Sequence, residues 1–168
     1  MSHVEHKDSA ASIQARCALI TLSDTRSEAT DTSGAKIKTL LAAEHHLVNY
    51  YAIIPDEPRE LSVLLEELIS SGDIDVILTN GGTGISRRDH TIPVIEKHLT
   101  TALPGFGELF RMLSYQQIGS SAMMSRAVAG IAKDKLVFAL PGSTAAVELA
   151  MTKLILPELK HLLGQMRK

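Results

Sequence analysis

Short apolar runs alternate with segments of helical periodicity along most of this chain, and this alternation is typical of layered α/β domains. The runs CALITLS (17–23), LVNYYAIIP (47–55) and IDVILTN (74–80) are rich in aliphatic and β-branched residues, as expected of strands buried on both faces. Between the second and third runs, leucines recur at i, i+3, i+4 and i+7 from Leu61, which marks one face of a helix. This order predicts right-handed crossovers and a mainly parallel sheet with helices on both sides.

The last third of the chain predicts an antiparallel strand within the same sheet. Residues 127–142 (AVAGIAKDKLVFALPG) have the pattern of two strands around a turn. The preceding segment is predicted to be helical in pieces, broken at Gly119. Ser143 is predicted to cap a final helix, which Pro157 kinks or restarts.

Composition and the N-terminal stretch restrict the partners and the compartment. Residues 1–15 are polar and lack the apolar core of a signal peptide, so we predict a short disordered tail before a single domain at 16–168. The net charge of −2, the absence of Trp and the small numbers of Phe and Tyr give no indication of a nucleic-acid or membrane partner. The single cysteine, Cys17, rules out an internal disulfide. We expect a soluble, cytoplasmic protein.

The segment TNGGTGISRRDHT (79–91) follows the third predicted strand directly. Ligands of such sheets bind beyond the carboxyl ends of the strands, so three further loops, at 23–26, 55–57 and 141–143, are expected to gather beside it. Its glycines could direct several backbone N–H groups at one anion, assisted by the start of a helix or by threonine hydroxyls. The alternative is an ordinary strand-to-helix turn, because the segment matches none of the common phosphate-loop patterns.

Asp89 favours the phosphate-binding interpretation, because a carboxylate beside a bound anion requires a cation between them. Mg²⁺ commonly binds through one or two carboxylates together with substrate phosphates. Asp56, after the second strand, is the natural second carboxylate, and Asp24, after the first, is a third candidate. Each acid could instead lie in a solvated turn or cap a helix. Arg87 and Arg88 could clamp phosphate oxygens or be surface charges.

Several segments, in order, resemble the molybdenum cofactor biosynthesis proteins of the MoaB/MogA type. GGTGISRRDHT (81–91) is similar to the family signature G-G-T-G-x-x-x-R-D-x-T. LSDTRS (22–27) is similar to its first-strand loop and IIPDE (53–57) to its second. PGFGELFRMLSYQQIGSSAMMSRAVAG (104–130), followed by LPGS (140–143), resembles the MoaB branch in particular.

The resemblance implies a three-layer α/β/α fold in a homotrimer or hexamer, and adenylylation of molybdopterin. The terminal phosphate of the pterin would attack the α-phosphate of Mg-ATP and release pyrophosphate, and a separate insertase would later add molybdenum. The resemblance implies that Asp56 and Asp89 are the catalytic, Mg²⁺-binding residues. Residue chemistry and resemblance together predict the following substrate- or phosphate-binding residues: Ser23, Asp24, Thr79, Gly81, Gly82, Thr83, Gly84, Arg88, Pro141, Gly142 and Ser143.

Two other functions fit the same sequence. A non-catalytic molybdopterin carrier would keep the fold without turnover, although it would gain little from both Asp56 and Asp89. Hydrolysis of a nucleotide pyrophosphate bond, as in competence-damage-type domains, fits less well because those domains lack FGELFRMLSY. His90 and Ile92 depart from the family pattern, and the role of His90 stays open. The segment 106–126, rich in Phe and Met, is predicted to form subunit contacts or intrachain packing.

Overall fold

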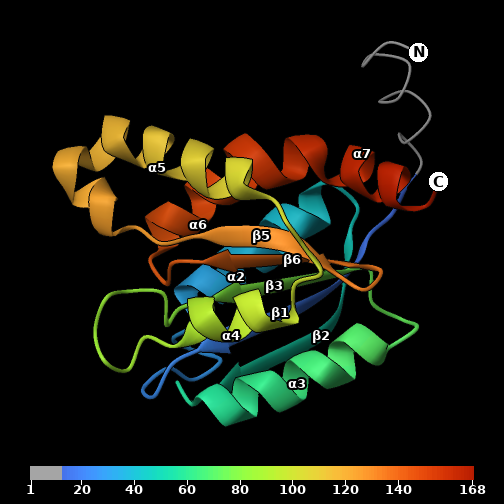
Figure 1. Cartoon of the computed structure of the whole chain (residues 1–168), viewed down its shortest axis with the longest axis horizontal. Helices are drawn as coiled ribbons and strands as arrows, with labels where there is room; N and C mark the ends of the chain where they lie inside the picture. Colours follow the sequence, from blue (N-terminus) through green and yellow to red (C-terminus); the bar gives the residue numbers. More distant parts are fainter. Residues whose placement is uncertain (1–12) are drawn as a thin grey trace.

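The computed structural model describes residues 13–168, and its strands form one mixed sheet (Figure 1). The strand order is β2-β1-β3-β6-β5-β4. Pairing is parallel from β2 through β6 and antiparallel on both sides of β5. The strands are β1 (Arg16–Leu22), β2 (Leu47–Ile54), β3 (Val76–Asn80), β4 (Thr101–Ala102), β5 (Val128–Ala132) and β6 (Lys135–Leu140).

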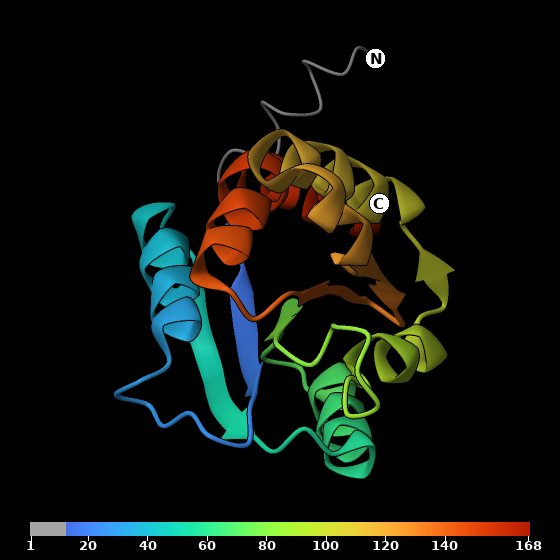
Figure 2. The ribbon, with the colours of Figure 1, turned by 90° about the vertical axis from the view of Figure 1, so that its left-hand side faces the viewer.

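Helices connect the strands and cover both faces of the sheet, as Figure 2 shows end-on. A π-helical turn, η2, joins the last two α-helices, and Pro157 lies in the first turn of the second. The helices are α2 (Thr32–Ala43), α3 (Pro58–Ser70), α4 (Thr91–His98), α5 (Pro104–Ile118), the 3-10 helix η1 (Gly119–Met124), α6 (Thr144–Ala150), η2 (Met151–Ile155) and α7 (Leu156–Met166).

Two apolar cores lie on opposite faces of the sheet. Alternate residues of β1 point to opposite sides, so Leu19 packs with α2, α5, α6 and α7, whereas Ile20 packs with α3 and α4. Phe110 and Ile95 are fully buried representatives of these two helix layers. The three-layer α/β/α arrangement and the mainly parallel sheet predicted from the sequence are confirmed.

Local details also agree with the sequence. Ser143 caps α6 by accepting a hydrogen bond from the Ala146 N–H, and the predicted helix break lies at Gly119. The short strand β4 was not predicted. Residues 13–15 already pack on the domain, where Ala15 is buried and its N–H donates to His46 Nδ1 at 3.0 Å. The rest of the predicted tail, 1–12, lies outside the described residues.

Among residues 13–168, no helix has both the length and the apolar character needed to cross a lipid bilayer.

Candidate active site

The loops that follow four parallel strands meet at one edge of the sheet. The order β2-β1-β3 places the reversal of strand order between β1 and β3, which is where open α/β sheets bind their ligands. The glycine loop leaves β3 at this point and lies against the end of β1, since a Cβ at Gly81 would collide with the carbonyl oxygen of Leu22. The sequence-based expectation that these loops lie together is met.

The glycine loop has a backbone that other residues adopt only with strain. Gly81 and Gly82 have φ of 98° and 64°, in the left-handed region that favours glycine. Three hydrogen bonds fix the turn: Gly81 N–H donates to Leu140 O at 3.0 Å, Thr91 Oγ1 donates to Gly81 O at 2.9 Å, and Thr91 N–H donates to Gly82 O at 3.1 Å. The loop is therefore held at its base by β6 and by the first residue of α4.

Three acidic residues converge on this loop. The carboxylate of Asp56 faces the backbone of Gly82, where an added Cβ would lie 2.6 Å from Asp56 Oδ1. Asp89 faces Gly84 in the same way, with 2.7 Å between that Cβ position and Asp89 Oδ2. Asp24 Oδ1 accepts a hydrogen bond from the Asp56 N–H at 3.1 Å. The carboxylates singled out in the sequence are thus brought together by β1, β2 and the glycine loop.

The pKa values of the two central carboxylates are shifted in opposite directions. Burial, followed by the negative charges of Asp89 and Asp24, raises the pKa of Asp56 above its ordinary value. Burial also acts to raise the pKa of Asp89, but hydrogen bonds from Ser86 and the Gly84 backbone outweigh it, and this pKa lies below the ordinary value. The surroundings therefore favour the ionised form of Asp89 and disfavour that of Asp56.

The residues present fit a magnesium ion that is shared with a phosphate ligand. Asp56 Oδ1 is buried and has no hydrogen-bond partner, which leaves an oxygen ligand available at the loop. Within residues 13–168 there is no cluster of three or more His, Cys, Asp or Glu side chains that could hold a metal alone. The free oxygen of Asp56 could serve as one ligand of Mg²⁺, a cation that also keeps water and phosphate oxygens in its coordination sphere.

Arg88 lies at the edge of this group and is paired with carboxylates. Its Nη2 donates to Asp24 Oδ2 at 2.7 Å and lies 3.6 Å from Glu57 Oε1. The side chain is 60% exposed, so it is free to exchange these partners for a ligand. His90 occupies the N-cap position of α4 without a side-chain capping hydrogen bond.

The remaining predicted residues divide between the loop surface and the interior. Ser23 Oγ accepts hydrogen bonds from the N–H groups of Thr25 and Arg26, and thus shapes the loop after β1. Thr79 and Thr83 are buried, and Thr79 Oγ1 has no partner among the described residues. The loop with Pro141, Gly142 and Ser143 touches the glycine loop, where a Cβ at Gly142 would lie 3.2 Å from Gly81 Cα.

A buried polar network beneath the loops was not predicted. The carboxylate of Asp31 is fully inaccessible and binds groups from several elements. It accepts hydrogen bonds from Thr21 Oγ1 at 2.6 Å, Tyr51 Oη at 2.8 Å, the Gly34 N–H at 3.0 Å and Ser33 Oγ at 3.1 Å. Burial acts to raise the pKa of Asp31, but these hydrogen bonds together hold it below its ordinary value.

This network reaches the loops through Ser33 and Arg26. Ser33 Oγ lies 2.7 Å from Asn80 Oδ1, at the start of the glycine loop. Arg26 Nη1 donates to Ser33 Oγ at 2.6 Å, and its Nη2 donates to Gly142 O at 2.9 Å. Asp31 is also the N-cap of α2, because its side chain accepts the Gly34 N–H. The available signal in the sequence was the presence of polar residues in otherwise apolar strand ends.

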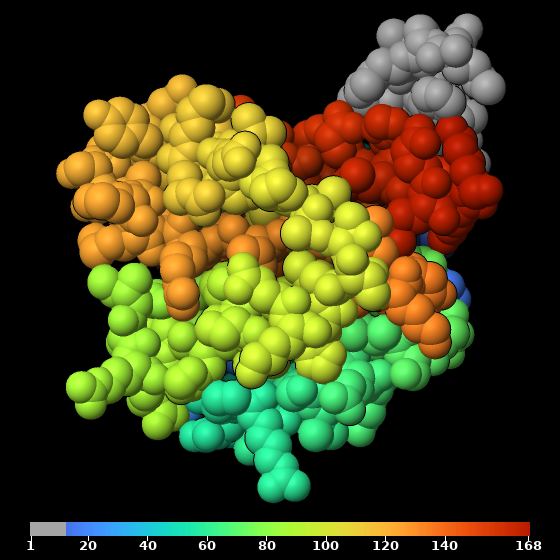
Figure 3. All heavy atoms as spheres, viewed as in Figure 1, coloured from blue at the N-terminus to red at the C-terminus, as the bar shows by residue number. Residues whose placement is uncertain are grey.

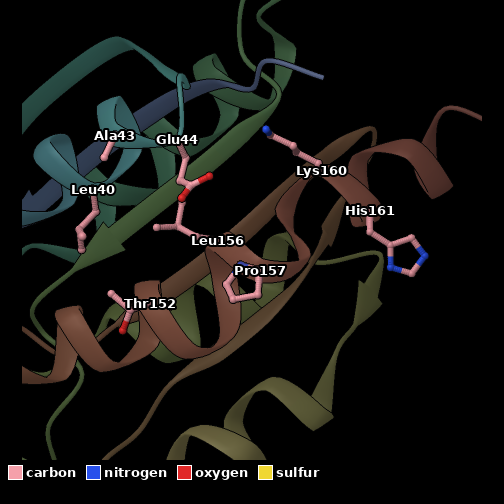
Figure 4. A pocket seen from close by; sticks show the side chains of 8 residues that line it. All are labelled: Leu40, Ala43, Glu44, Thr152, Leu156, Pro157, Lys160 and His161. Atoms are coloured by element: carbon pink, nitrogen blue, oxygen red, sulfur yellow. The ribbon is translucent and has the colours of Figure 1, made fainter. Parts of the chain in front are cut away.

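A separate cavity of about 440 Å³ lies between α2 and the last helices (Figure 4). None of the predicted site residues lines it. Its lining comes from the end of α2, from η2 and from α7: Leu40, Ala43, Glu44, Thr152, Leu156, Pro157, Lys160 and His161.

Comparison with known proteins agrees with the geometry. The family described as "Probable molybdopterin binding domain" matches residues 18–161. The chain is 48% identical over 154 residues to molybdenum cofactor biosynthesis protein B of Halalkalibacterium halodurans, covering 91% of each chain. A crystal structure of a molybdenum cofactor biosynthesis protein B superposes with a TM-score of 0.90 at 47% identity, covering 92% of this chain and 97% of that one.

A more distant structure extends the comparison. The tungsten cofactor synthesizing protein MoaB of Pyrococcus furiosus has a TM-score of 0.82 at 38% identity, with 92% of this chain and 98% of that chain covered. The similarity in all three cases spans the glycine loop and the strands that carry the acidic residues. The chain therefore belongs to the molybdopterin-binding domain family of molybdenum cofactor biosynthesis proteins, on its MoaB branch.

Proposed function

We propose that this protein acts in molybdenum cofactor biosynthesis as a molybdopterin adenylyltransferase that uses Mg-ATP. The observation that carries the proposal is the buried, unpartnered Oδ1 of Asp56 beside the backbone of Gly82, with Asp89 on the other side of the same loop. A site that only bound an anionic pterin would be weakened by these carboxylates. A site that transfers a nucleotidyl group needs them to accommodate a cation among the phosphates.

The reaction is a substitution at the α-phosphorus of ATP. An oxygen of the terminal phosphate of molybdopterin forms the new P–O bond, and the bond to the β-phosphate breaks. Pyrophosphate leaves with the electron pair, and molybdopterin-AMP remains. The attacking phosphate monoester is largely ionised at neutral pH, because its second pKa is about 6. No strong general base is required, which agrees with a site that offers positioning and charge rather than a nucleophilic side chain.

The chain's own residues have separate roles in this scheme. The backbone N–H groups around Gly82 and Gly84 bind phosphate oxygens, assisted by the N-terminal end of α4. Asp56 and Asp89 would hold Mg²⁺, which when bound neutralises phosphate charge. Arg88 can move from Asp24 to a phosphate oxygen. Ser23 and Ser143, in the loops after β1 and β6, would contact the substrate. This step precedes metal insertion, so the proposal holds for a molybdenum or a tungsten pathway.

The test is release of pyrophosphate from Mg-ATP in the presence of purified molybdopterin. We expect turnover by the wild type and a loss of about 10²-fold or more in Asp89→Asn, the scale of losing one electrostatic contact to the transition state. Asp73→Asn is the matched control, because Asp73 is an acid whose side chain is 89% exposed. Tight molybdopterin binding without pyrophosphate release by the wild type would contradict the proposal and identify a carrier.

The same proposal includes a cytoplasmic protein that assembles as a homotrimer or hexamer and passes its product to a molybdenum insertase.

A further inference from the structure

Arg126 contacts the glycine loop from outside the four strand-end loops. It lies between η1 and β5, distant from the loop in sequence. Its Nε donates to Thr83 O at 3.0 Å, and its Nη2 donates to Asp89 O at 3.4 Å. In Figure 3 the orange atoms of the η1 and β5 region lie above the light green atoms of the region that contains the glycine loop.

The two carbonyl groups that Arg126 contacts bracket the projecting part of the loop. Between Thr83 and Asp89 the chain turns outward, and Ile85 is 72% exposed. Inside this turn the Ser86 N–H donates to Asp89 Oδ2 at 2.8 Å. The guanidinium group of Arg126 therefore bridges the two ends of the turn by hydrogen bonds to Thr83 O and Asp89 O.

Arg126 and Arg88 have different binding partners. Arg88 is paired with Asp24 and lies near Glu57. For Arg126, no carboxylate within residues 13–168 lies at ion-pair distance, and its hydrogen bonds go to carbonyl oxygens. Its charge acts on Asp89 from farther away and contributes to the lowered pKa of that carboxyl. The guanidinium of Arg126 is half-buried and planar, so the directions of its N–H groups are fixed relative to each other. Such a group can fix the distance between the two backbone carbonyl groups that it binds.

We propose that Arg126 is a positioning residue of the active site: its fork fixes the separation of Thr83 and Asp89 and thereby holds the Asp89 carboxylate against Gly84 and beside Asp56. The inference rests on the proposed adenylyl transfer for its effect on turnover, but not for its effect on the loop. A lysine at this position would keep the charge but present one nitrogen to two carbonyl groups, so it would not restore the clamp.

Three variants test the proposal: Arg126→Gln and Arg126→Lys remove the fork, and Arg59→Gln removes one exposed charge from α3 as a control. Two properties are measured, the steady-state rate of pyrophosphate release and the hydrogen exchange of the Ser86 amide. We expect kcat to fall about 10²-fold in both Arg126 variants with KM for ATP little changed, since misplacement by about 1 Å has effects of that size. We expect Ser86 to exchange faster while amides of β1 and β3 keep their protection.

A further variant separates positioning from general damage to the fold. In Arg126→Ala, added guanidinium ion, at concentrations far below those that unfold proteins, is expected to restore part of the lost kcat. Full activity of Arg126→Gln, or full rescue by Arg126→Lys, would overturn the proposal, as would unchanged exchange of Ser86. If the wild type itself releases no pyrophosphate, the adenylyltransferase proposal fails, and the exchange of Ser86 alone decides whether Arg126 clamps the loop.

Discussion

Asp56 is a proposed Mg²⁺ ligand whose Oδ1 is buried without a hydrogen-bond partner. Its ionised form therefore lowers the free energy of unfolding. Its pKa is raised in the folded state, first by burial and then by Asp89 and Asp24. The folded protein therefore binds this proton more tightly than the unfolded chain. Its contribution to stability falls as pH rises from the unfolded pKa of about 3.9 through the higher folded pKa.

We predict that Asp56→Asn raises the midpoint of thermal unfolding at neutral pH in the absence of Mg²⁺, while it abolishes pyrophosphate release. The amide removes a charge that the folded state disfavours. Calorimetry at neutral pH and near pH 4 measures the effect, which should shrink at the lower pH as the wild-type carboxyl becomes protonated. A lower midpoint for the variant at neutral pH would show that Asp56 is not disfavoured in its ionised form.

Asp75 gives the opposite pH dependence. Hydrogen bonds from Arg16, at 2.9 Å to Oδ1 and 3.0 Å to Oδ2, lower its pKa from 3.8 to about 2. The contribution of Asp75 to the free energy of unfolding is present above the pKa of the unfolded chain, and it is lost as pH falls from about 4 toward 2. We predict that Asp75→Asn destabilises the protein by roughly 2 kcal/mol at neutral pH. Denaturant unfolding measures this, and the difference from wild type should decrease in acid; a constant difference would contradict the assignment.

At the scale of elements, the turn from β3 into the glycine loop depends on the absence of a side chain at Gly82. A Cβ there would meet Thr91 Oγ1 and lie 2.6 Å from Asp56 Oδ1, and φ is 64°. We predict that Gly82→Ala costs about 1–3 kcal/mol of stability and displaces Asp56. The rate of pyrophosphate release should fall by more than the decrease in the folded fraction, calculated from the thermal midpoint, can explain.

Gly72→Ala is the matched control, because a Cβ at that turn would have no atom within 4 Å. Equal effects of the two substitutions would indicate that the loop is an ordinary turn.

The elements that the sequence predicted are those specified by local patterns. The apolar runs of β1, β2 and β3, the β5–β6 hairpin and the Ser143 cap depend on neighbouring residues. Strand β4 has two residues and exists only because Thr101 pairs with Ile131 of β5, so no local signal predicts it. The π-helical turn likewise reflects how the last helices pack rather than a sequence motif.

The site was predictable to the extent that topology determines it. Parallel strands bring their following loops to one edge, so the positions of Asp24, Asp56 and Asp89 followed from the order of elements. The Arg26 contact with Gly142 and the Arg126 contact with Thr83 join positions 116 and 43 residues apart. Neither lies in a periodic pattern, and only the folded chain reveals them.

For the whole molecule, most of the exposed large apolar side chains within residues 13–168 belong to α5 and η1, which form the golden upper left part of Figure 3. For segment 106–126 the sequence allowed subunit contacts or intrachain packing, and part of the segment packs within the chain: Phe110 is fully buried, and Phe106 packs edge-on against Phe138 at 5.3 Å between ring centroids. The exposed remainder comprises Leu109, Met112, Tyr115, Ile118, Met123 and Met124. Met112, Tyr115 and Met123 line one surface hollow and so form an apolar patch.

We predict that this patch is covered in a homo-oligomer, because contiguous apolar surface of this kind marks protein contacts. Met123 is 80% exposed, and we expect Met123→Glu to shift the protein toward monomers in analytical ultracentrifugation. Val63→Glu is the control, because Val63 is an exposed apolar residue of α3, and this substitution should cause no such shift. An unchanged sedimentation coefficient for Met123→Glu would place the subunit contacts elsewhere.

The buried carboxylate of Asp31 also bears on how the chain finds its fold. It holds Thr21 of β1 and Tyr51 of β2 at one point, and these strands pair in a register that sets Tyr51 opposite Leu19. A slip of one residue would turn Tyr51 to the other face, and a slip of two would carry its hydroxyl about 7 Å away. Either slip removes the Tyr51 hydrogen bond to Asp31 Oδ2 and leaves this buried oxygen with one hydrogen bond fewer. The hydrogen bonds of Asp31 to Thr21 and Tyr51 thus favour the native alignment of β1 and β2 over alignments shifted by one or two residues.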